Sequence, residues 1–358
     1  MRHRCLLISL MLLMASASRG QDTLRLLFAG DAMSHVVQVN WAKTDTGLDY
    51  SPCFALVEPY VKRADYAAVN LEAPLAGEPY TGFPRFSAPD EYLMALARTG
   101  FDLFLLANNH IADRGREGLE RTVKTLEKQG VDYAGAYLTQ EARSCRYPLY
   151  KAFYTDYDSL VVAFMNCTYG TNGLTVAGPN IVNRIDTAQI VSDLEEMERS
   201  TDLKVMCIHW GVEYKKHSSE SQRRMAQWLA DKGFDLVIGS HPHVVQEYEV
   251  LRAADGREVP VFYSLGNMLS NQRWRGSNGG IMAEVSISAA TKKIVDIGYI
   301  PIYVHKGIWQ GRKQYHLIPT AEVYDTLGSV SMPRWDKDSL AVFHRDTEQK
   351  LSNTKIIK

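Results

Sequence analysis

The chain has 358 residues, of which 46% are hydrophobic and 23% are charged, and its formal net charge is −1. These values are typical of a globular protein with a sizeable core, long enough for one large domain or two ordinary ones. The balanced charge provides no basic field for nucleic acid and no polybasic run for an anionic membrane surface, so we expect no nucleic-acid partner.

The first twenty residues predict a secretory signal peptide. A basic head at residues 1–4 precedes an apolar run from Cys5 to Met14 and a group of small residues at 15–18. The alternative is an uncleaved signal anchor, which the shortness of the apolar run disfavours. We therefore expect residues 1–20 to be a signal peptide and the protein to be exported, either to the periplasm or to the cell surface.

Six short apolar runs follow, and each ends at a polar residue able to bind a metal or a proton. The runs are LRLLFAGD, YAAVNLE, FDLFLLANNH, VMCIHWG, FDLVIGSHPH and VFYSLGN. Continuous apolar runs of about this length are typical of strands that are buried on both faces.

Helical patterns separate these runs, at residues 90–99, 115–129, 186–200 and 219–232. Asp90 is a candidate N-cap, and Ser219 with Gln222 predicts a capping box. Alternation of strands and helices predicts an α/β layered fold over residues 24–320, followed by a polar C-terminal tail at 321–358.

Two segments of the chain resemble each other: ARTGFDLFLLANNH and ADKGFDLVIGSHPH. Both read as the end of a helix, a Gly-Phe-Asp-Leu connection, a strand and then histidine. Two ordinary helix-to-strand connections explain this better than an internal duplication. In either case both segments deliver their histidines at the same end of a strand.

The polar residues at the strand ends predict a metal site. In open α/β sheets the loops at the carboxyl ends of the strands gather residues from several strands. Here those ends provide Asp31, Glu72, Asn109, His110, His209, His241 and His243. A lone histidine at a strand end is usually a packing residue, but seven such groups are hard to explain by packing alone.

These side chains suit one or two divalent ions. Imidazole and carboxylate oxygen are ligands of Zn, Mn and Fe, while the scattered cysteines match no zinc-thiolate spacing. A bridging carboxylate can hold two ions about 3.5–4 Å apart, the arrangement used for displacement at phosphorus. A histidine that is not needed as a ligand could protonate the leaving oxygen.

The ordered blocks GDAMSH, NLEAPL, ANNHIADRG, HWGVEY, GSHPH and YSLGN resemble the CapA family of bacterial poly-γ-glutamate capsule synthesis proteins, in the calcineurin-like metallophosphoesterase superfamily. The resemblance runs from about residue 24 to residue 267. It implies an α/β/β/α sandwich of two mixed sheets flanked by helices, and a role in capsule or surface-polymer biosynthesis. It also implies an anionic polymer or a phosphorylated small-molecule or lipid-linked substrate, with membrane-bound capsule synthesis proteins as partners.

The resemblance assigns a role to each candidate residue. Asp31 and His243 resemble ligands of a first metal, and Glu72 stands at the bridging position. The remaining assignments are Asn109, His209 and His241 as ligands of a second metal, and His110 as the acid that contacts phosphate.

The first three blocks depart from the superfamily pattern. His35 comes four residues after Asp31 instead of two, so it either reaches the same metal or does not bind. Glu72 replaces an aspartate and is one methylene longer, which could favour one metal or move the pair apart. Asn108 replaces a glycine and could compete with Asn109.

Other nearby residues have alternative interpretations. Asp113 either caps the helix at 115–129, which we favour, or orients His110 by a hydrogen bond. Asn267 could hydrogen-bond a metal ligand. The arginines and aromatics of the loop at 271–280 could contact an anionic substrate, although a solvated loop is the simpler interpretation.

Three functions remain open from the sequence. The first is a secreted metal-dependent hydrolase of the CapA type, with arginine side chains orienting the anion. The second is a non-catalytic polymer-binding or export subunit, and the third is an extracytoplasmic nucleotidase or other phosphoesterase. Fold alone does not decide among them.

Overall fold

The computed structural model describes residues 23–154, 159–197, 201–309, 312–324 and 332–357. The predicted signal peptide at residues 1–20 lies outside this part of the chain. Within it, no helix is both long and apolar enough to cross a membrane.

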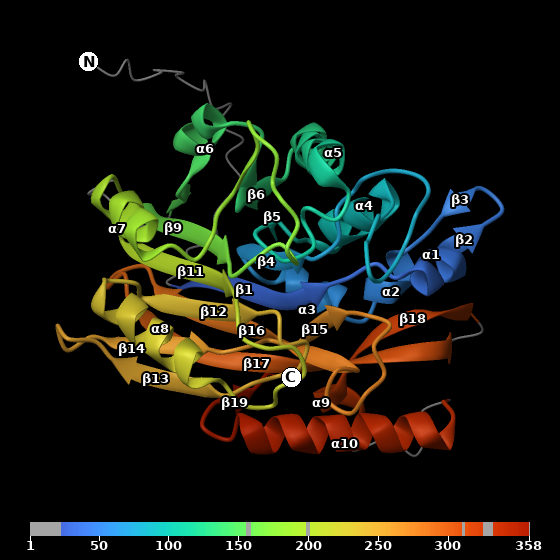
Figure 1. The fold of residues 1–358 in the computed structure, drawn as a ribbon. Helices are drawn as coiled ribbons and strands as arrows, with labels where there is room; N and C mark the ends of the chain where they lie inside the picture. Colours follow the sequence, from blue (N-terminus) through green and yellow to red (C-terminus); the bar gives the residue numbers. More distant parts are fainter. Residues whose placement is uncertain (1–22, 155–158, 198–200, 310–311, 325–331, 358) are drawn as a thin grey trace.

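Two mixed sheets form the centre of the molecule (Figure 1). Among the described residues, the strands of the larger sheet are β1 (Thr23–Ala32), β4 (Tyr66–Leu71), β5 (Leu103–Leu105), β6 (Asp132–Ala134), β15 (Asn267–Leu269), β16 (Gly279–Ser288), β17 (Ile294–Trp309), β18 (Arg312–Pro319) and β19 (Lys355–Ile356). Their order is β18-β17-β16-β1-β4-β5-β6, with β15 paired to β1 and β19 paired to β17. Strands β1, β4, β5 and β6 are parallel, so their carboxyl ends share one edge.

The smaller sheet has the order β13-β14-β12-β11-β9-β8. Its strands are β8 (Leu149–Tyr154), β9 (Ser159–Thr168), β11 (Leu203–His209), β12 (Leu236–Ser240), β13 (Tyr248–Arg252) and β14 (Glu258–Phe262). Strands β9, β11 and β12 are parallel. Two small ribbons pair β2 (Lys43–Thr44) with β3 (Gly47–Leu48) and β7 (Ala136–Tyr137) with β10 (Ile181–Val182).

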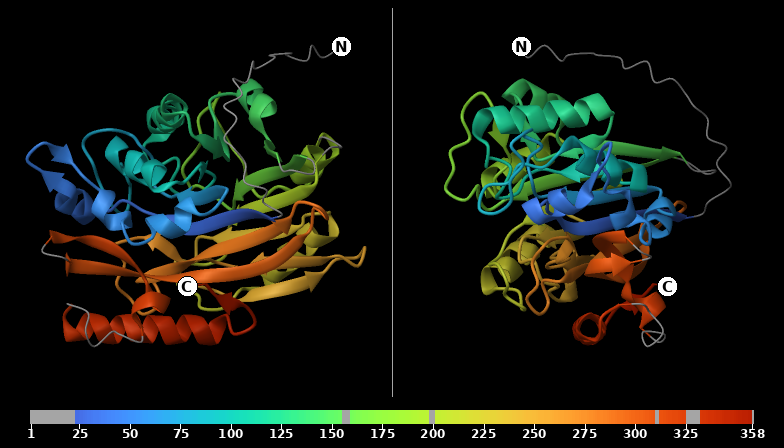
Figure 2. Two further views of the ribbon diagram at one scale, coloured as in Figure 1. Left: turned by 180° about the vertical axis from the view of Figure 1, so that it is seen from behind. Right: turned by 90° about the vertical axis from the view of Figure 1, so that its right-hand side faces the viewer.

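Helices flank the two sheets. They are α1 (Val36–Ala42), α2 (Ser51–Phe54), α3 (Glu58–Lys62), α4 (Asp90–Thr99), α5 (Gly115–Gln129), α6 (Gln140–Arg146), α7 (Thr187–Glu195), α8 (Glu220–Asp231), α9 (Thr320–Val323) and α10 (Arg334–Lys350). Helices α4 and α5 lie over the larger sheet, and α8 lies against β12 and β13 of the smaller one (Figures 1 and 2). The predicted α/β/β/α sandwich of two mixed sheets flanked by helices is confirmed.

Strand β1 shows why the apolar runs are continuous. Leu26 and Phe28 pack in the core between the sheets, with Phe164 among others. Leu27 and Ala29 point the other way, into the core beneath the helices. Because successive side chains of a strand alternate between its faces, a strand covered on both sides needs apolar residues throughout.

The predicted helices at 90–99 and 115–129 coincide with α4 and α5. The capping box is also present, with the Ser219 hydroxyl accepting from the Gln222 N–H at 3.2 Å. The N-cap prediction for Asp90 is wrong: Pro89 occupies that position, and the Asp90 carboxylate instead pairs with Arg121. The helix expected at 186–200 is shorter, because α7 ends at Glu195 and residues 198–200 lie outside the described chain.

The segment at 321–358, expected to be a polar tail, contains α10 and β19. Helix α10 packs against β17, where Leu340 and Phe343 are buried in the core. Strand β19 pairs in parallel with β17. The polar composition of this segment therefore includes the exposed face of an amphipathic helix.

Candidate metal centre

Two glycines let the sheets approach each other at the site. A Cβ on Gly30, directly before Asp31, would lie 2.0 Å from the carbonyl oxygen of Gly266. A Cβ on Gly239 would lie 2.0 Å from the carbonyl oxygen of Tyr263. Both positions therefore require glycine, because the segment between Tyr263 and Gly266 passes against β1 and β12 in backbone contact.

The larger sheet supplies carboxylates and amides. Asp31 is the second-last residue of β1, and its Oδ1 accepts from the Asn70 amide at 2.8 Å. The same Asn70 Nδ2 donates to Glu72 Oε2 at 3.2 Å. Asn70 and Glu72 are two residues apart at the end of β4, so they share one face of the strand. Asp31 and Glu72 are both fully buried.

The smaller sheet supplies imidazoles. His209 ends β11, and its Nε2 lies 2.9 Å from Asn109 Oδ1 across the gap between the sheets. His241 and His243 follow β12 and flank Pro242, with φ angles of 100° and 58°. Positive φ is uncommon for residues with a side chain, and such strain is concentrated at functional sites. It orients two successive histidines into one cluster, where their ring centroids are 6.0 Å apart.

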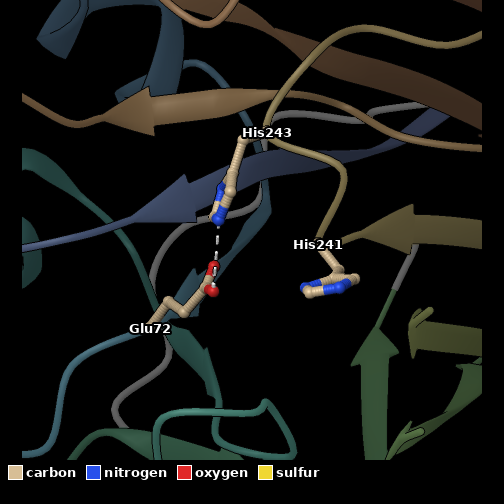
Figure 3. Close-up of side chains that lie close together, drawn as sticks. All are labelled: Glu72, His241 and His243. Atoms are coloured by element: carbon tan, nitrogen blue, oxygen red, sulfur yellow. Dashed lines mark ion pairs between the residues drawn. The ribbon is translucent and has the colours of Figure 1, made fainter. Parts of the chain in front are cut away.

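Glu72 joins the two sets of side chains. Its Oε1 lies 3.7 Å from His209 Nε2 and 3.8 Å from His243 Nε2. Figure 3 shows the His243 ring pointing at the Glu72 carboxylate, with His241 beside them. Ligand atoms of Glu72, His241 and His243 lie within 4.8 Å of one another, and so do those of Asp31, Glu72 and His209.

Glu72 thus belongs to both groups, as expected of a bridging ligand. The groups divide the histidines differently from the expected assignment, which placed His243 with Asp31 and His209 with His241. His243 Nδ1 nevertheless lies 3.1 Å from Asp31 Oδ2. Which side chain serves which ion therefore stays a prediction.

Burial sets the protonation of the cluster. Burial and then the charge of Asp31 raise the pKa of Glu72 well above its ordinary value. Burial and then the charges of His241 and His243 lower the pKa of His209 well below its ordinary value. Burial and then His243 lower the pKa of His241 to about 3. Burial alone would raise the pKa of Asp31, but the hydrogen bond and charge of His243 outweigh it, and that pKa is lowered.

The donor set fits a divalent cation. Among the described residues, Glu72 Oε1 and His241 Nδ1 are buried without a hydrogen-bond partner, and such orphaned polar atoms are costly unless something else binds them. Metal binding requires neutral imidazole and ionised carboxylate. The lowered pKa values of His209 and His241 keep these two imidazoles neutral, and a cation's charge would drive the proton from Glu72. Oxygen and imidazole nitrogen together suit Zn, Mn or Fe.

His110 is held by a carboxylate. Its Nδ1 lies 2.8 Å from Asp113 Oδ2, which also accepts from the Phe86 N–H. The Phe86 ring packs edge-on against His110, with centroids 4.7 Å apart. The capping role favoured for Asp113 is wrong, because α5 begins after Arg114 and has no side-chain cap. The alternative interpretation, a hydrogen bond that orients His110, is the one observed.

The two asparagines before His110 have separate roles. Asn109 reaches His209, while Asn108 donates to the Leu71 carbonyl oxygen at 2.9 Å. Asn108 Oδ1 also accepts from the His110 N–H at 3.1 Å. Asn108 Nδ2 also donates to Asn70 Oδ1 at 3.2 Å, so Asn108 braces the loop after β5 against β4, whereas Asn109 is the asparagine that contacts His209.

Asn267 and His35 lie beside the cluster. Asn267 Oδ1 is 3.1 Å from His243 Nδ1, which leaves Nε2 of that ring as the ligand atom. His35 is the N-cap residue of α1, and its Nε2 lies 3.4 Å from Ser270 Oγ. His35 belongs to neither ligand group among the described residues.

Sequence reasoning missed several residues that position the ligands. Asn70 links Asp31 to Glu72 by hydrogen bonds. The spacing of two residues between Asn70 and Glu72 in YAAVNLE could have indicated it, because residues two apart in a strand share one face. Ser240 Oγ lies 2.9 Å from His209 Nδ1. The Tyr169 ring, after β9, packs at a tilt against the His241 ring, with centroids 4.6 Å apart. No sequence pattern indicates the last contact, because Tyr169 follows a strand that carries no ligand.

The arginines of the loop at 271–280 turn away from the cluster. Arg273 contacts Asp336, and Arg275 pairs with Asp346, both on α10. The aromatic of this loop, Trp274, is 64% exposed and packs against Tyr214, whose ring lies 5.9 Å from His243. The aromatic side of the loop, and not its arginines, therefore borders the site.

Fold and site define a class: a two-sheet α/β/β/α protein with a buried cluster of metal-type ligands at the shared edge of its sheets. Residues 25–272 match the family described as "Bacterial capsule synthesis protein PGA_cap". The chain therefore belongs to this family of bacterial capsule synthesis proteins.

Individual relatives agree with that family. The chain is 27% identical over 303 residues to the capsule biosynthesis protein CapA of Bacillus anthracis, a match covering 81% of this chain and 69% of the relative. It is 29% identical over 270 residues to the PGA biosynthesis protein CapA of Bacillus subtilis, covering 71% and 65%. Among solved structures, it is similar to the NAD nucleotidase of Haemophilus influenzae, with a TM-score of 0.49, 14% identity and coverage of 91% and 68%.

Proposed function

We propose that this protein is an exported, metal-dependent hydrolase that acts in the biosynthesis of capsule or poly-γ-glutamate. One observation carries the proposal: the buried Glu72 is shared by two groups of ligand-type side chains. A purely polymer-binding subunit has no need of such a cluster, because two buried carboxylates and three buried histidines destabilise the folded state.

The residues that would hold one or two cations are Asp31, Glu72, Asn109, His209, His241 and His243. When bound, a divalent cation would supply Lewis acidity toward an oxygen atom of the substrate. Asn70, Ser240 and Asn267 fix the orientation of these ligands by hydrogen bonds.

His110 is the proposed general acid. Asp113 engages Nδ1, so Nε2 is the ring nitrogen free to exchange a proton with the substrate. In the protonated ring this nitrogen would donate to the leaving oxygen or nitrogen, and the Asp113 carboxylate would hold the ring in position. The edge of Phe86 packs against the same ring and excludes water from one side.

The proposed substrate is anionic, either a carboxylate-bearing polymer or a phosphorylated small molecule or lipid-linked precursor. The relatives' names refer to capsule and PGA biosynthesis, which supports the first choice. Membrane-bound capsule synthesis proteins are the proposed partners, and export would follow from the signal predicted at residues 1–20.

The test is hydrolysis by protein reconstituted with Zn, Mn or Fe, against a γ-glutamyl oligomer, a chromogenic phosphomonoester, a phosphodiester and a nucleotide. We expect cation-dependent turnover of the oligomer or of a phosphoester, abolished by His110→Ala. Bound cation without turnover of any of these substrates would indicate the binding subunit instead. Turnover confined to nucleotides would indicate a nucleotidase.

A further inference from the structure

Two lysines and two aromatic rings form a basic patch beside the metal centre. Lys306 Nζ, on β17, lies 5.2 Å from the ring centroid of Trp41 and 5.7 Å from that of Tyr315. Lys313 Nζ, on β18, lies 4.8 Å from the same Trp41 ring. The two ammonium groups therefore share one indole on α1, which packs against β18 (Figure 1). We call Trp41, Lys306, Lys313 and Tyr315 the lysine patch.

No carboxylate of the described part of the chain balances the positive charge of the lysine patch. Among the described residues, neither Lys306 nor Lys313 has a carboxylate within ion-pair distance. Lys306 Nζ instead donates to Asn271 Oδ1 at 3.0 Å. Burial and then the charges of Arg273 and Lys313 lower the pKa of Lys306. Neighbouring like charges destabilise a folded chain, and a bound anion would relieve that repulsion.

A second lysine–tryptophan pair elsewhere in the molecule lacks these features. Lys232, after α8, lies 5.9 Å from the Trp228 ring centroid, and no second cation shares that ring among the described residues. A cation–π contact needs only one lysine, as at Trp228, so it does not explain why two lysines lie over Trp41. The two tryptophans differ in the number of positive charges beside the ring.

The lysine patch is connected to the metal centre by two short segments. Asn271, which binds Lys306 and the Tyr315 hydroxyl, directly follows Ser270, the contact of His35. His35 begins α1, the helix that carries Trp41. The charge of Lys306 also reaches His35, whose pKa is lowered to about 4 by burial, then by His243, His110 and Lys306.

We propose that the lysine patch is a binding subsite for carboxylate groups of an extended substrate, away from the bond that reacts at the metal centre. Two separate ammonium groups suit separate, singly charged carboxylates, whereas a phosphate is more often gripped by a convergent fork of donors. The indole between them provides a flat apolar surface for the chain that links the carboxylates. This inference rests on the proposed function in one respect, that the substrate is an anionic polymer.

The test is binding of a fluorescent γ-linked glutamate oligomer, followed by anisotropy at low salt. The Lys306→Gln/Lys313→Gln double variant should bind about tenfold more weakly, as expected for two lost charge contacts. Lys306→Arg/Lys313→Arg should retain binding, because it keeps both charges. Lys232→Gln is the matched control and should bind as the wild type does.

Three outcomes would overturn the subsite: wild-type affinity in the double glutamine variant, equal weakening in Lys232→Gln, or equal affinity for an uncharged γ-linked glutamine oligomer. Inorganic polyphosphate is the competing probe. If only its binding depended on the two lysines, the carboxylate assignment would be wrong. Because Lys313 is exposed, Lys313→Gln alone should fold and weaken binding in the same direction.

The binding test of the lysine patch can fail or succeed independently of the hydrolysis test of the proposed function. The anisotropy measurement is repeated with His110→Ala, which should bind the oligomer unchanged while turning over nothing. Failure of all hydrolysis with binding intact would reject the hydrolase and keep the subsite. Normal turnover of a small ester with binding indifferent to the lysines would reject the subsite alone.

Discussion

The two halves of the candidate metal centre share one type of strand connection but carry different ligand-type side chains. In the larger sheet, Asp102 precedes β5 and accepts from the Ala67 N–H of β4 at 2.8 Å. In the smaller sheet, Asp235 precedes β12 and accepts from the Lys204 N–H of β11 at 2.9 Å. The preceding glycines, Gly100 and Gly233, both have positive φ. The same Gly-Phe-Asp-Leu connection thus starts a strand that leads to the site in each half.

The halves differ in the ligand-type side chains at their strand ends. Asp31 and Glu72 lie at the ends of β1 and β4 in one half, and His209, His241 and His243 lie at the ends of β11 and β12 in the other. Burial has opposite effects on the two types, raising the pKa of Glu72 and lowering that of His209. Both effects remove charge from the cluster, one by adding a proton and the other by losing it. A bound cation would reverse only the protonation of Glu72. Metal binding should therefore change the charge of the carboxylate half more than that of the imidazole half.

The largest expected effect concerns His110, the histidine of the carboxylate half. His110→Ala should lower turnover by about 10²–10⁴-fold, the usual contribution of a general acid, while the bound metal is retained. Asp113→Asn should lower it less, by about 10–100-fold, since the ring remains but loses its orienting carboxylate. Single-turnover kinetics with metal analysis of each variant measures both. Loss of metal in His110→Ala would show that the ring is a ligand instead.

Glu72→Gln tests the shared ligand. Metal affinity should fall by more than about 100-fold, beyond the usual cost of losing an outer hydrogen bond to a ligand. The metal-free variant should nevertheless be at least as stable as the wild type at neutral pH. The raised pKa of Glu72 means that its stabilising contribution is lost as pH rises through that pKa, and glutamine has no proton to lose. Calorimetric unfolding with and without metal measures both quantities, and a destabilised metal-free variant would contradict the expected protonation.

Sequence patterns predicted the elements that carry a local signal. The continuous apolar runs identified the buried strands, and Ser219 with Gln222 identified the start of α8. Asp113 was misassigned because its partners, His110 and the Phe86 N–H, meet only in the folded chain. The contact of Tyr169 with His241 and the packing of Phe343 likewise depend on how distant segments meet. Residue type indicates that a side chain can bind a metal, whereas backbone φ decides where His241 and His243 point.

Acid pH should lower the stability of the metal-free protein through His241, in the imidazole half. The pKa of His241 is lowered to about 3 in the fold, against 6.5 for an ordinary histidine. Below pH 6.5 the unfolded chain therefore binds a proton that the folded chain does not, and stability falls by about 1.4 kcal/mol per pH unit for this group. Chelator-treated His241→Asn should lose about 1.4 kcal/mol less than the wild type between pH 7.5 and 5.5. Asparagine tolerates the positive φ at this position.

Urea unfolding of the wild type and of His241→Asn at the two pH values measures this difference. An equal loss of stability in the wild type and in His241→Asn would show that this ring is not held neutral.

The smallest expected effect concerns the Gly-Phe-Asp-Leu connection that precedes both β5 and β12. Asp102→Ala and Asp235→Ala should each destabilise the protein by about 1 kcal/mol, because each leaves a strand N–H without its acceptor. The two effects should add, since the sites lie in different sheets and share no partner. Denaturant unfolding of both single variants and the double variant tests this. A large effect from only one substitution would show that the two connections are alike in sequence but not in role.

Metal analysis shows directly whether the two halves jointly bind a divalent cation. The full chain, reconstituted with Zn, Mn or Fe and dialysed, should retain one or two equivalents, and His243→Ala should retain less than the wild type. His243 contacts both Asp31 and the Glu72 side of the cluster, so its loss should affect either ion. No retained metal in the wild type, or unchanged metal content in His243→Ala, would show that the cluster does not bind a cation as proposed.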